Sequence, residues 1–239
     1  MAYITFQPSD YFNTVLWTGN ATANRNITGV GFQPDWVWVK NRSRSSNHTI
    51  VDVLRGSGSY PMSSSNTGAE DTSDANQVSA LISDGFTVGS STNTNANSEN
   101  LVGWSWKAGG SGSSNSDGSI TSTVSASTTS GVSIVTWTGN SGSIGHGLGQ
   151  KPAMIISKSR GATGGWYITH KSLSAEMQDN YMFFDTSANS TNNDIWGGEP
   201  TTSTFSVGSG LIGNTTHVAY VFAEKKGFSK FGSYTGNGN

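Results

Sequence analysis

The chain has 239 residues, of which 12% are charged, with 13 Lys and Arg against 15 Asp and Glu, and it contains no cysteine. This near-neutral balance without a basic cluster argues against nucleic acid as a partner, and the lack of cysteine excludes disulfides and thiolate metal sites. No apolar run approaches the roughly 20 residues that a membrane-spanning helix needs, so we expect no membrane insertion.

Short apolar segments alternate with turns rich in Gly, Asn and Ser, and no stretch sustains a helical period. Residues 36–39, Trp-Val-Trp-Val, are apolar on both faces, which predicts a central strand covered on each side. Residues 77–82 are the one helix-like candidate, a single turn. In chain order, strands are predicted at residues 13–18, 35–40, 48–53, 85–89, 100–107, 133–138, 153–158, 166–170, 181–184, 204–208 and 217–224.

The chain also repeats itself, with matching phrases in the same order. The offset between the copies runs from 116 (102 to 218) to 121 (60 to 181), so a unit of domain size has been duplicated. We therefore predict an all-β chain of two tandem antiparallel β-sandwich domains, residues 1–108 and 131–239. The matched phrases are 17–20 with 137–140, 31–42 with 150–160, 84–90 with 203–209, and 102–106 with 218–222.

Two segments lie outside the duplicated phrases. Residues 109–130 are rich in Gly, Ser and Thr, which predicts a flexible linker, although alternation of Thr and Val over 119–129 is compatible with an extended strand. Residues 228–239 repeat the phrase Thr-Gly-Asn, with Tyr234 in the aromatic position. We favour the first strand of a third unit in a longer array; the alternative is a segment that closes the second unit.

These phrases resemble a repeated domain of tail-fibre and other structural proteins of marine bacteriophages. The resemblance implies a lectin-like jelly-roll sandwich of the concanavalin or laminin-G type, used in virion appendages and without a catalytic motif. It covers nearly the whole chain. Its motifs are residues 11–20, 29–42, 84–89 and 104–110 in the first unit, and 133–140, 144–149, 167–172, 219–224 and 227–237 in the second.

Two tryptophans beside Gly-rich loops, Trp166 and Trp196, are the candidates for contact with a sugar ring; a lid over the core or an interface position is the competing interpretation. Glu70, Asp71 and Asp74 gather three carboxylates in one loop, as calcium binding requires. Their spacing lacks the alternating oxygens of a calcium loop, so a solvated loop is the main interpretation. Apart from this calcium alternative we expect no cofactor.

The tryptophans of residues 35–40 and 100–107 suggest a sugar-stacking platform, but we interpret them as core because the second unit keeps their bulk with other side chains. The four histidines show no pair at metal-ligand spacing, so no metal site is predicted. No acid-x-acid pair and no Gly-x-Ser-x-Gly turn occur, so no catalytic residue and no enzyme is predicted. The platform candidates are Trp36, Trp38, Trp104 and Trp106, replaced by Met154, Ile156, Tyr220 and Phe222.

We therefore expect a module of a bacteriophage virion appendage, a tail fibre or capsid-attached fibre, that adheres to the host surface through glycan. It would be made in the host cytoplasm and act outside the cell as part of the virion, with other virion proteins as partners and a homotrimer as one option. Repeated modules gain avidity from weak sites. The alternatives are a purely structural virion spacer or head-decoration protein, and a cellular adhesin or secreted carbohydrate-binding module.

Overall fold

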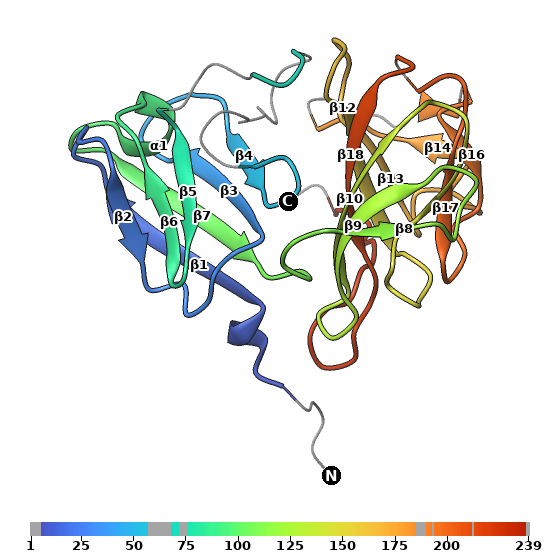
Figure 1. The fold of residues 1–239 in the computed structure, drawn as a ribbon, viewed down its shortest axis with the longest axis horizontal. Helices are drawn as coiled ribbons and strands as arrows, with labels where there is room; N and C mark the ends of the chain where they lie inside the picture. Colours follow the sequence, from blue (N-terminus) through green and yellow to red (C-terminus); the bar gives the residue numbers. More distant parts are fainter. Residues whose placement is uncertain are drawn as a thin grey trace.

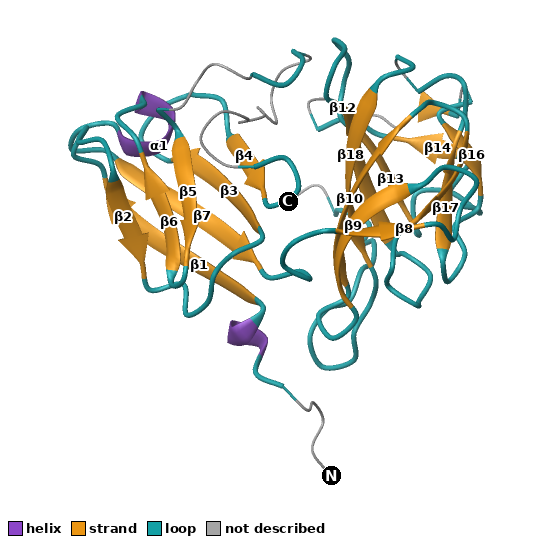
Figure 2. Ribbon diagram, viewed as in Figure 1, coloured by secondary structure: helices purple, strands orange, loops and turns teal. Residues whose placement is uncertain are grey.

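The fold is described from a computed structural model, in which residues 6–56, 68–71, 76–184, 190–192, 194–211 and 213–237 are placed well enough to describe. Strands dominate these residues (Figure 2), and their helical turns are η1 (Pro8–Asp10) and α1 (Thr92–Asn95). The chain is all-β, as predicted. No helix among the described residues is long and apolar enough to cross a membrane.

The first half of the chain, β1 to β7, forms two antiparallel sheets that enclose a core. The larger sheet has the order β1 (Phe12–Thr18), β7 (Asn100–Trp106), β3 (Trp36–Asn41), β4 (Thr49–Asp52). The smaller has the order β2 (Arg25–Thr28), β6 (Gly85–Val88), β5 (Val78–Ile82). The side chains buried between them include Val15, Trp17, Ile27, Val37, Val39, Phe86 and Leu101.

The second half, β8 to β18, repeats this plan with additions. Its large sheet runs β13 (Tyr167–His170), β12 (Met154–Ser159), β18 (Thr216–Phe222), β10 (Val132–Thr138), β9 (Ser122–Ser127), β8 (Ser113–Asn115). Its smaller sheets are β11 (Gly142–Gly145), β17 (Thr204–Val207), β16 (Trp196–Gly198), and the pair β14 (Asn180–Tyr181) with β15 (Ser190–Thr191). Its core includes Val135, Trp137, Ile144, Ile155, Trp196, Phe205 and Val221.

The duplication seen in the sequence is present in the topology. The order β1-β7-β3-β4 recurs as β10-β18-β12-β13, and β2-β6-β5 recurs as β11-β17-β16. Even a loop contact is repeated: the amine of Lys40 donates to the carbonyl of Ser46 (2.7 Å), and the amine of Lys158 donates to the carbonyl of Gly164 (2.6 Å). In both halves a lysine therefore holds the loop six residues further along the chain.

The segment predicted as a flexible linker is built into the second half. It contributes β8 and β9, which extend the large sheet beyond β10 (Figure 1). The alternation of Ser and Thr with apolar residues explains this, because it lets Val124 reach the core while Thr123 and Ser125 lie on the opposite face of β9. The boundary near residue 130 is thus a turn within one sheet.

The single-turn helix predicted at residues 77–82 is wrong, because these residues form β5. Val78 is buried in the core of the first half, and β5 pairs with β6 across the tight connection at Ser83 and Asp84. At the C-terminus, residues 231–237 contain no strand, and Phe231 lies against Phe222 of β18 (ring centroids 6.0 Å apart).

A third apolar cluster joins the two halves. The large sheets turn their outer faces toward each other, and Trp36 of β3 stacks on Tyr220 of β18 with ring centroids 4.1 Å apart and planes 10° from parallel. Trp36 also stacks on Trp106 of β7, and the centroids of these two rings are again 4.1 Å apart. The prediction that both faces of residues 36–39 are covered is confirmed, because Val37 and Val39 face the core of the first half and Trp36 and Trp38 face the second half.

Lys158 makes the stability of the fold depend on pH. Burial lowers the pKa of its amine from an ordinary 10.5 to about 8. Between these values the unfolded chain binds more protons than the folded chain, so stability increases with pH, by at most about 1.4 kcal/mol per pH unit. Replacing Lys158 by Met should remove this increase in urea titrations between pH 8 and 10. A Lys158→Met variant that keeps the full increase would contradict the assignment.

Candidate functional site

Neither candidate tryptophan is presented to solvent. Trp166 is 2% exposed and belongs to the cluster between the halves, where it stacks near Tyr220. Trp196 is 3% exposed and lies in the core of the second half. Their glycine neighbours serve close packing: a Cβ on Gly165 would lie 2.4 Å from the ring of Phe183, and one on Gly197 would lie 2.8 Å from the carbonyl oxygen of Val207. The predicted role as exposed sugar contacts therefore does not fit the structure.

The acidic loop is divided by the structure. The Glu70 carboxylate is 6% exposed and accepts bonds from Arg55 (2.9 Å) and Arg160 (2.9 and 3.0 Å), while the Glu70 amide donates to the Arg160 carbonyl (2.8 Å). Two guanidinium groups already neutralise this carboxylate, which leaves little charge for a cation. Asp71 is exposed, and Asp74 lies outside the described residues. The described residues contain no group of three potential ligands that could hold a metal ion.

Glu70 belongs instead to a buried polar network between the halves. The side chain of Arg55 is fully buried and pairs with Asp52 of β4 (2.5 Å) as well as with Glu70. Arg55 also donates to the hydroxyl of Tyr220 (3.0 Å), and this hydroxyl donates to Asp52 (2.7 Å). Burial raises the pKa of Tyr220 well above its usual value, so the hydroxyl keeps its proton and remains a donor. The network links β4 to β18 and fixes the halves in one register.

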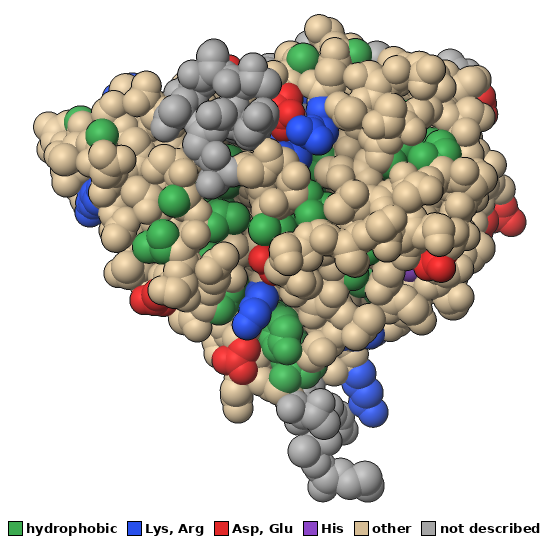
Figure 3. Space-filling model, in the orientation of Figure 1, with side chains coloured by type: hydrophobic (Ala, Val, Ile, Leu, Met, Phe, Trp, Pro, Cys, Tyr) green, Lys and Arg blue, Asp and Glu red, His purple; other side chains and the backbone are tan. Residues whose placement is uncertain are grey.

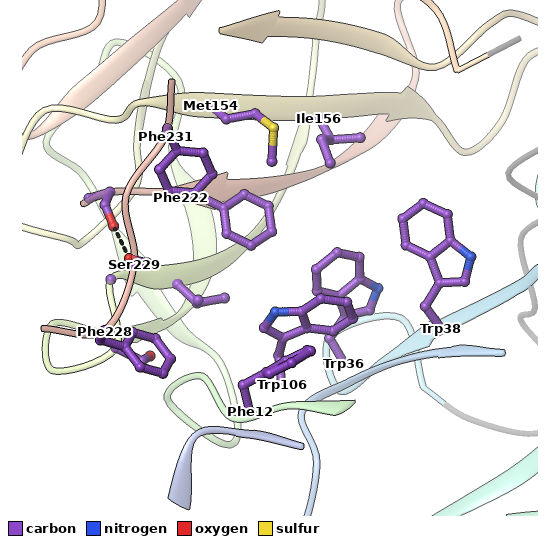
Figure 4. Close-up of a pocket in the computed structure, with 14 residues that line it drawn as sticks. Phe12, Trp36, Trp38, Trp106, Met154, Ile156, Phe222, Phe228, Ser229 and Phe231 are labelled. Atoms are coloured by element: carbon purple, nitrogen blue, oxygen red, sulfur yellow. Dashed lines mark hydrogen bonds between the residues drawn. The ribbon is translucent and has the colours of Figure 1, made fainter. Parts of the chain in front are cut away.

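Beside this network the halves leave a cavity, which we call the junction pocket, of about 360 Å³ (Figure 4). Rings from the first half form one side, and apolar side chains of β12, β18 and the C-terminal segment form the other. On the face drawn in Figure 3, apolar side chains reach the surface along the junction of the two halves. Lining residues include Phe12, Trp36, Trp38, Trp106, Met154, Ile156, Phe222, Phe228 and Phe231.

The polar groups at the junction pocket are few. Trp36 is 1% exposed, and its Nε1–H has no acceptor among the described residues. An unpaired buried donor is unfavourable, so this N–H lowers the stability of the junction rather than adding to it. By contrast, the Trp38 Nε1–H donates to Nδ1 of His48 (2.7 Å). Burial lowers the pKa of His48, which favours the neutral ring that can accept this bond.

The C-terminal segment forms one wall of the junction pocket. Lys225 and Ser229 form a short bridge, and Phe228 and Phe231 turn toward the cavity (Figure 4). The amide of Phe231 donates to the Glu224 carboxylate (2.9 Å), which also pairs with Lys171. The Lys171 bond, followed by the Phe231 amide, lowers the pKa of Glu224. This wall is therefore held by a partly buried carboxylate, by the bridge between Lys225 and Ser229, and by two rings.

Apart from the hydroxyls of Ser130 and Ser229, the residues that line the junction pocket carry no titratable or nucleophilic side chain. The hydroxyls of both serines lie near backbone carbonyls, Lys107 (3.3 Å) and Ala223 (3.4 Å). The Trp-Val-Trp-Val strand, which is apolar on both faces, was the sequence signal that a second apolar face would be covered. It could not show that the second face meets another half of the chain, nor that the C-terminal phenylalanines close the pocket.

The fold and this site define an all-β protein whose sandwich-like antiparallel sheets carry an aromatic pocket at their junction. The chain belongs to a family described as a domain of unknown function (DUF7483), which matches residues 7–239 and so spans both halves. No curated protein and no solved structure showed significant similarity to the chain.

Proposed function

We propose that this chain is a module of a bacteriophage virion appendage, a tail fibre or capsid-attached fibre, and that it adheres to a host-surface glycan through the junction pocket. The observation that carries the proposal is the pocket itself, which has a volume of about 360 Å³ and is lined by aromatic rings. Aromatic rings pack well on the apolar faces of sugar rings, and such a volume lies in the range of small-molecule sites.

We further propose that each half is a jelly-roll sandwich of the lectin-like type. Two facing antiparallel sheets with the same strand order in both halves support this interpretation. The phrases that resemble marine phage structural proteins run through the same strands. In this proposal the partners are other virion proteins and the site of action is the virion surface.

The lining of the junction pocket narrows the ligand class. The nine lining residues named above all have apolar side chains. A fully hydroxylated hexose in this pocket would therefore lose its hydrogen bonds to water without gaining others from the protein. A sugar that carries methyl or acetyl groups buries apolar atoms there, and it has fewer hydroxyl groups that lose their bonds to water. We therefore expect 6-deoxy, N-acetyl or O-acetyl sugars to bind in preference to glucose or mannose.

The test compares two variants of the C-terminal segment. Phe231→Ala removes a wall of the pocket, while Tyr234→Ala changes a ring that is 94% exposed three residues further on. On an array of bacterial glycans, Phe231→Ala should weaken binding at least tenfold and Tyr234→Ala should leave it unchanged. Equal binding by both variants would remove the pocket from the proposal.

The second candidate function is a structural spacer of the virion. It is favoured by the rings at the junction, which hold the two halves together whether or not a ligand binds. An array without any response from the unmodified chain, together with a subunit-to-subunit contact that buries the junction in intact particles, would favour the spacer over adhesion.

A further inference from the structure

The second half seals one edge of its sheets with a segment that precedes β10. Strand β9 pairs with β10 from Val132↔Ser127 to Thr136↔Thr123. Just before β9, Ile120 forms a bridge with Ile144 of β11, and its amide donates to the carbonyl of Ser143 (3.0 Å). The segment therefore closes the edge that β10 and β11 share.

The equivalent edge of the first half, formed by β1 and β2, is open. β1 pairs with β7 on one side, and no described residue forms a strand on its other side. The Lys107 amide donates to the Tyr11 carbonyl, and the Gly19 amide donates to the Glu99 carbonyl. These bonds show that the backbone N–H and C=O groups of the odd-numbered residues of β1 point toward β7. The backbone groups of Phe12, Thr14 and Leu16 consequently point away from the sheet.

Two local contacts touch this open edge without closing it. The Thr14 amide is taken by the side chain of its neighbour Asn13 (2.9 Å), and the Thr18 carbonyl accepts from Arg25 (2.6 Å). Leu16 lies between these two positions, and neither its amide nor its carbonyl has a partner among the described residues. The Leu16 side chain is 65% exposed, whereas its counterpart Thr136 is paired with Thr123 of β9.

Core residues next to the open edge are also less well covered than their counterparts. Three equivalent pairs differ in the same direction, which is what a missing strand would produce. The exposed fractions are 9% for Val15 against 0% for Val135, 9% for Trp17 against 4% for Trp137, and 5% for Ile27 against 0% for Ile144.

We propose that the open edge of β1 binds an extended, uncharged segment of another protein, which adds to the sheet as β9 adds to β10. The second half shows the chemistry this segment needs. It is uncharged, alternates Ser or Thr with Val or Ala, and places a small apolar residue against Val15, as Val124 lies against Val135. Backbone bonds give affinity in such strand addition, and the alternate side chains give specificity. This inference does not depend on the junction pocket.

The probe is a dye-labelled peptide with the sequence of residues 119–128, titrated into the full chain and followed by fluorescence anisotropy. We expect saturable binding and slowed hydrogen exchange of the Leu16 amide. Two altered peptides serve as controls: Ser125→Pro removes a central amide that faces the edge, and Val124→Asp places a charge against Val15. Both should bind at least tenfold more weakly.

A variant of the chain locates the peptide. Leu16→Pro blocks strand addition but removes no bond to β7, so its melting temperature should stay close to that of the parent. Binding that survives Leu16→Pro, or no saturable binding to the parent chain, would overturn the proposal. A concentration-dependent dimer in sedimentation that Leu16→Pro converts to monomer would also overturn it, because the occupant would then be a second copy of this chain.

Discussion

Replacing Arg55 by Ala should lower the free energy of unfolding by about 3–5 kcal/mol. The guanidinium is fully buried and satisfies Asp52, Glu70, the Tyr220 hydroxyl and the Ile50 carbonyl. Its removal leaves the Asp52 carboxylate buried without its cation, and a buried unpaired charge costs far more than a lost surface contact. Urea unfolding followed by tryptophan fluorescence measures the change.

The matched control for this change is Lys151→Ala. Lys151 pairs with Glu199, but the two side chains are 50% and 29% exposed, so water screens the pair. Its loss should cost at most about 1 kcal/mol. If Arg55→Ala cost no more than Lys151→Ala, the network between the halves would be without importance for stability.

Replacing Trp36 by Ala should cost about 3–5 kcal/mol and should also separate the unfolding of the two halves. The ring of Trp36 connects the two halves, because it stacks on Trp106 of its own sheet and on Tyr220 of the other half. With Trp36 present we expect one calorimetric transition. Without it, each half keeps its own core and should melt separately.

The control for Trp36→Ala is Val37→Ala, one residue along β3. Val37 points into the core of the first half and not toward the junction. It should destabilise the first half by a smaller amount and leave Trp36 in contact with Tyr220. A single unchanged transition for Trp36→Ala would show that the halves are held together by other contacts.

Much of the fold could be predicted from residue patterns. The apolar segments at residues 35–40 and 100–107 predicted strands whose bounds lie within one residue of β3 and β7, because both segments are largely buried. Short edge strands such as β2 and β11 went unpredicted, since four residues carry too few apolar positions to stand out. The segment at 77–82 misled because its apolar residues are adjacent rather than alternating.

The candidate site was less accessible to sequence reasoning. Glycines beside Trp166 suggested an exposed loop, whereas Gly165 is required there because the ring of Phe183 occupies the space of a side chain. A carboxylate in a polar loop gives no sign that two distant arginines will neutralise it, as happens to Glu70. Both misreadings concern partners far apart in the chain, which no local pattern records.

The place where the second half begins has a consequence for how such modules can be exchanged by recombination. A breakpoint near residue 130 would leave β8 and β9 behind and expose the flank of β10 to aggregation. Breakpoints between β7 and β8, at residues 107–112, keep each ladder intact. A shuffled unit would still need a Trp-rich outer face of matching shape, so viable hybrids should exchange the halves as a pair.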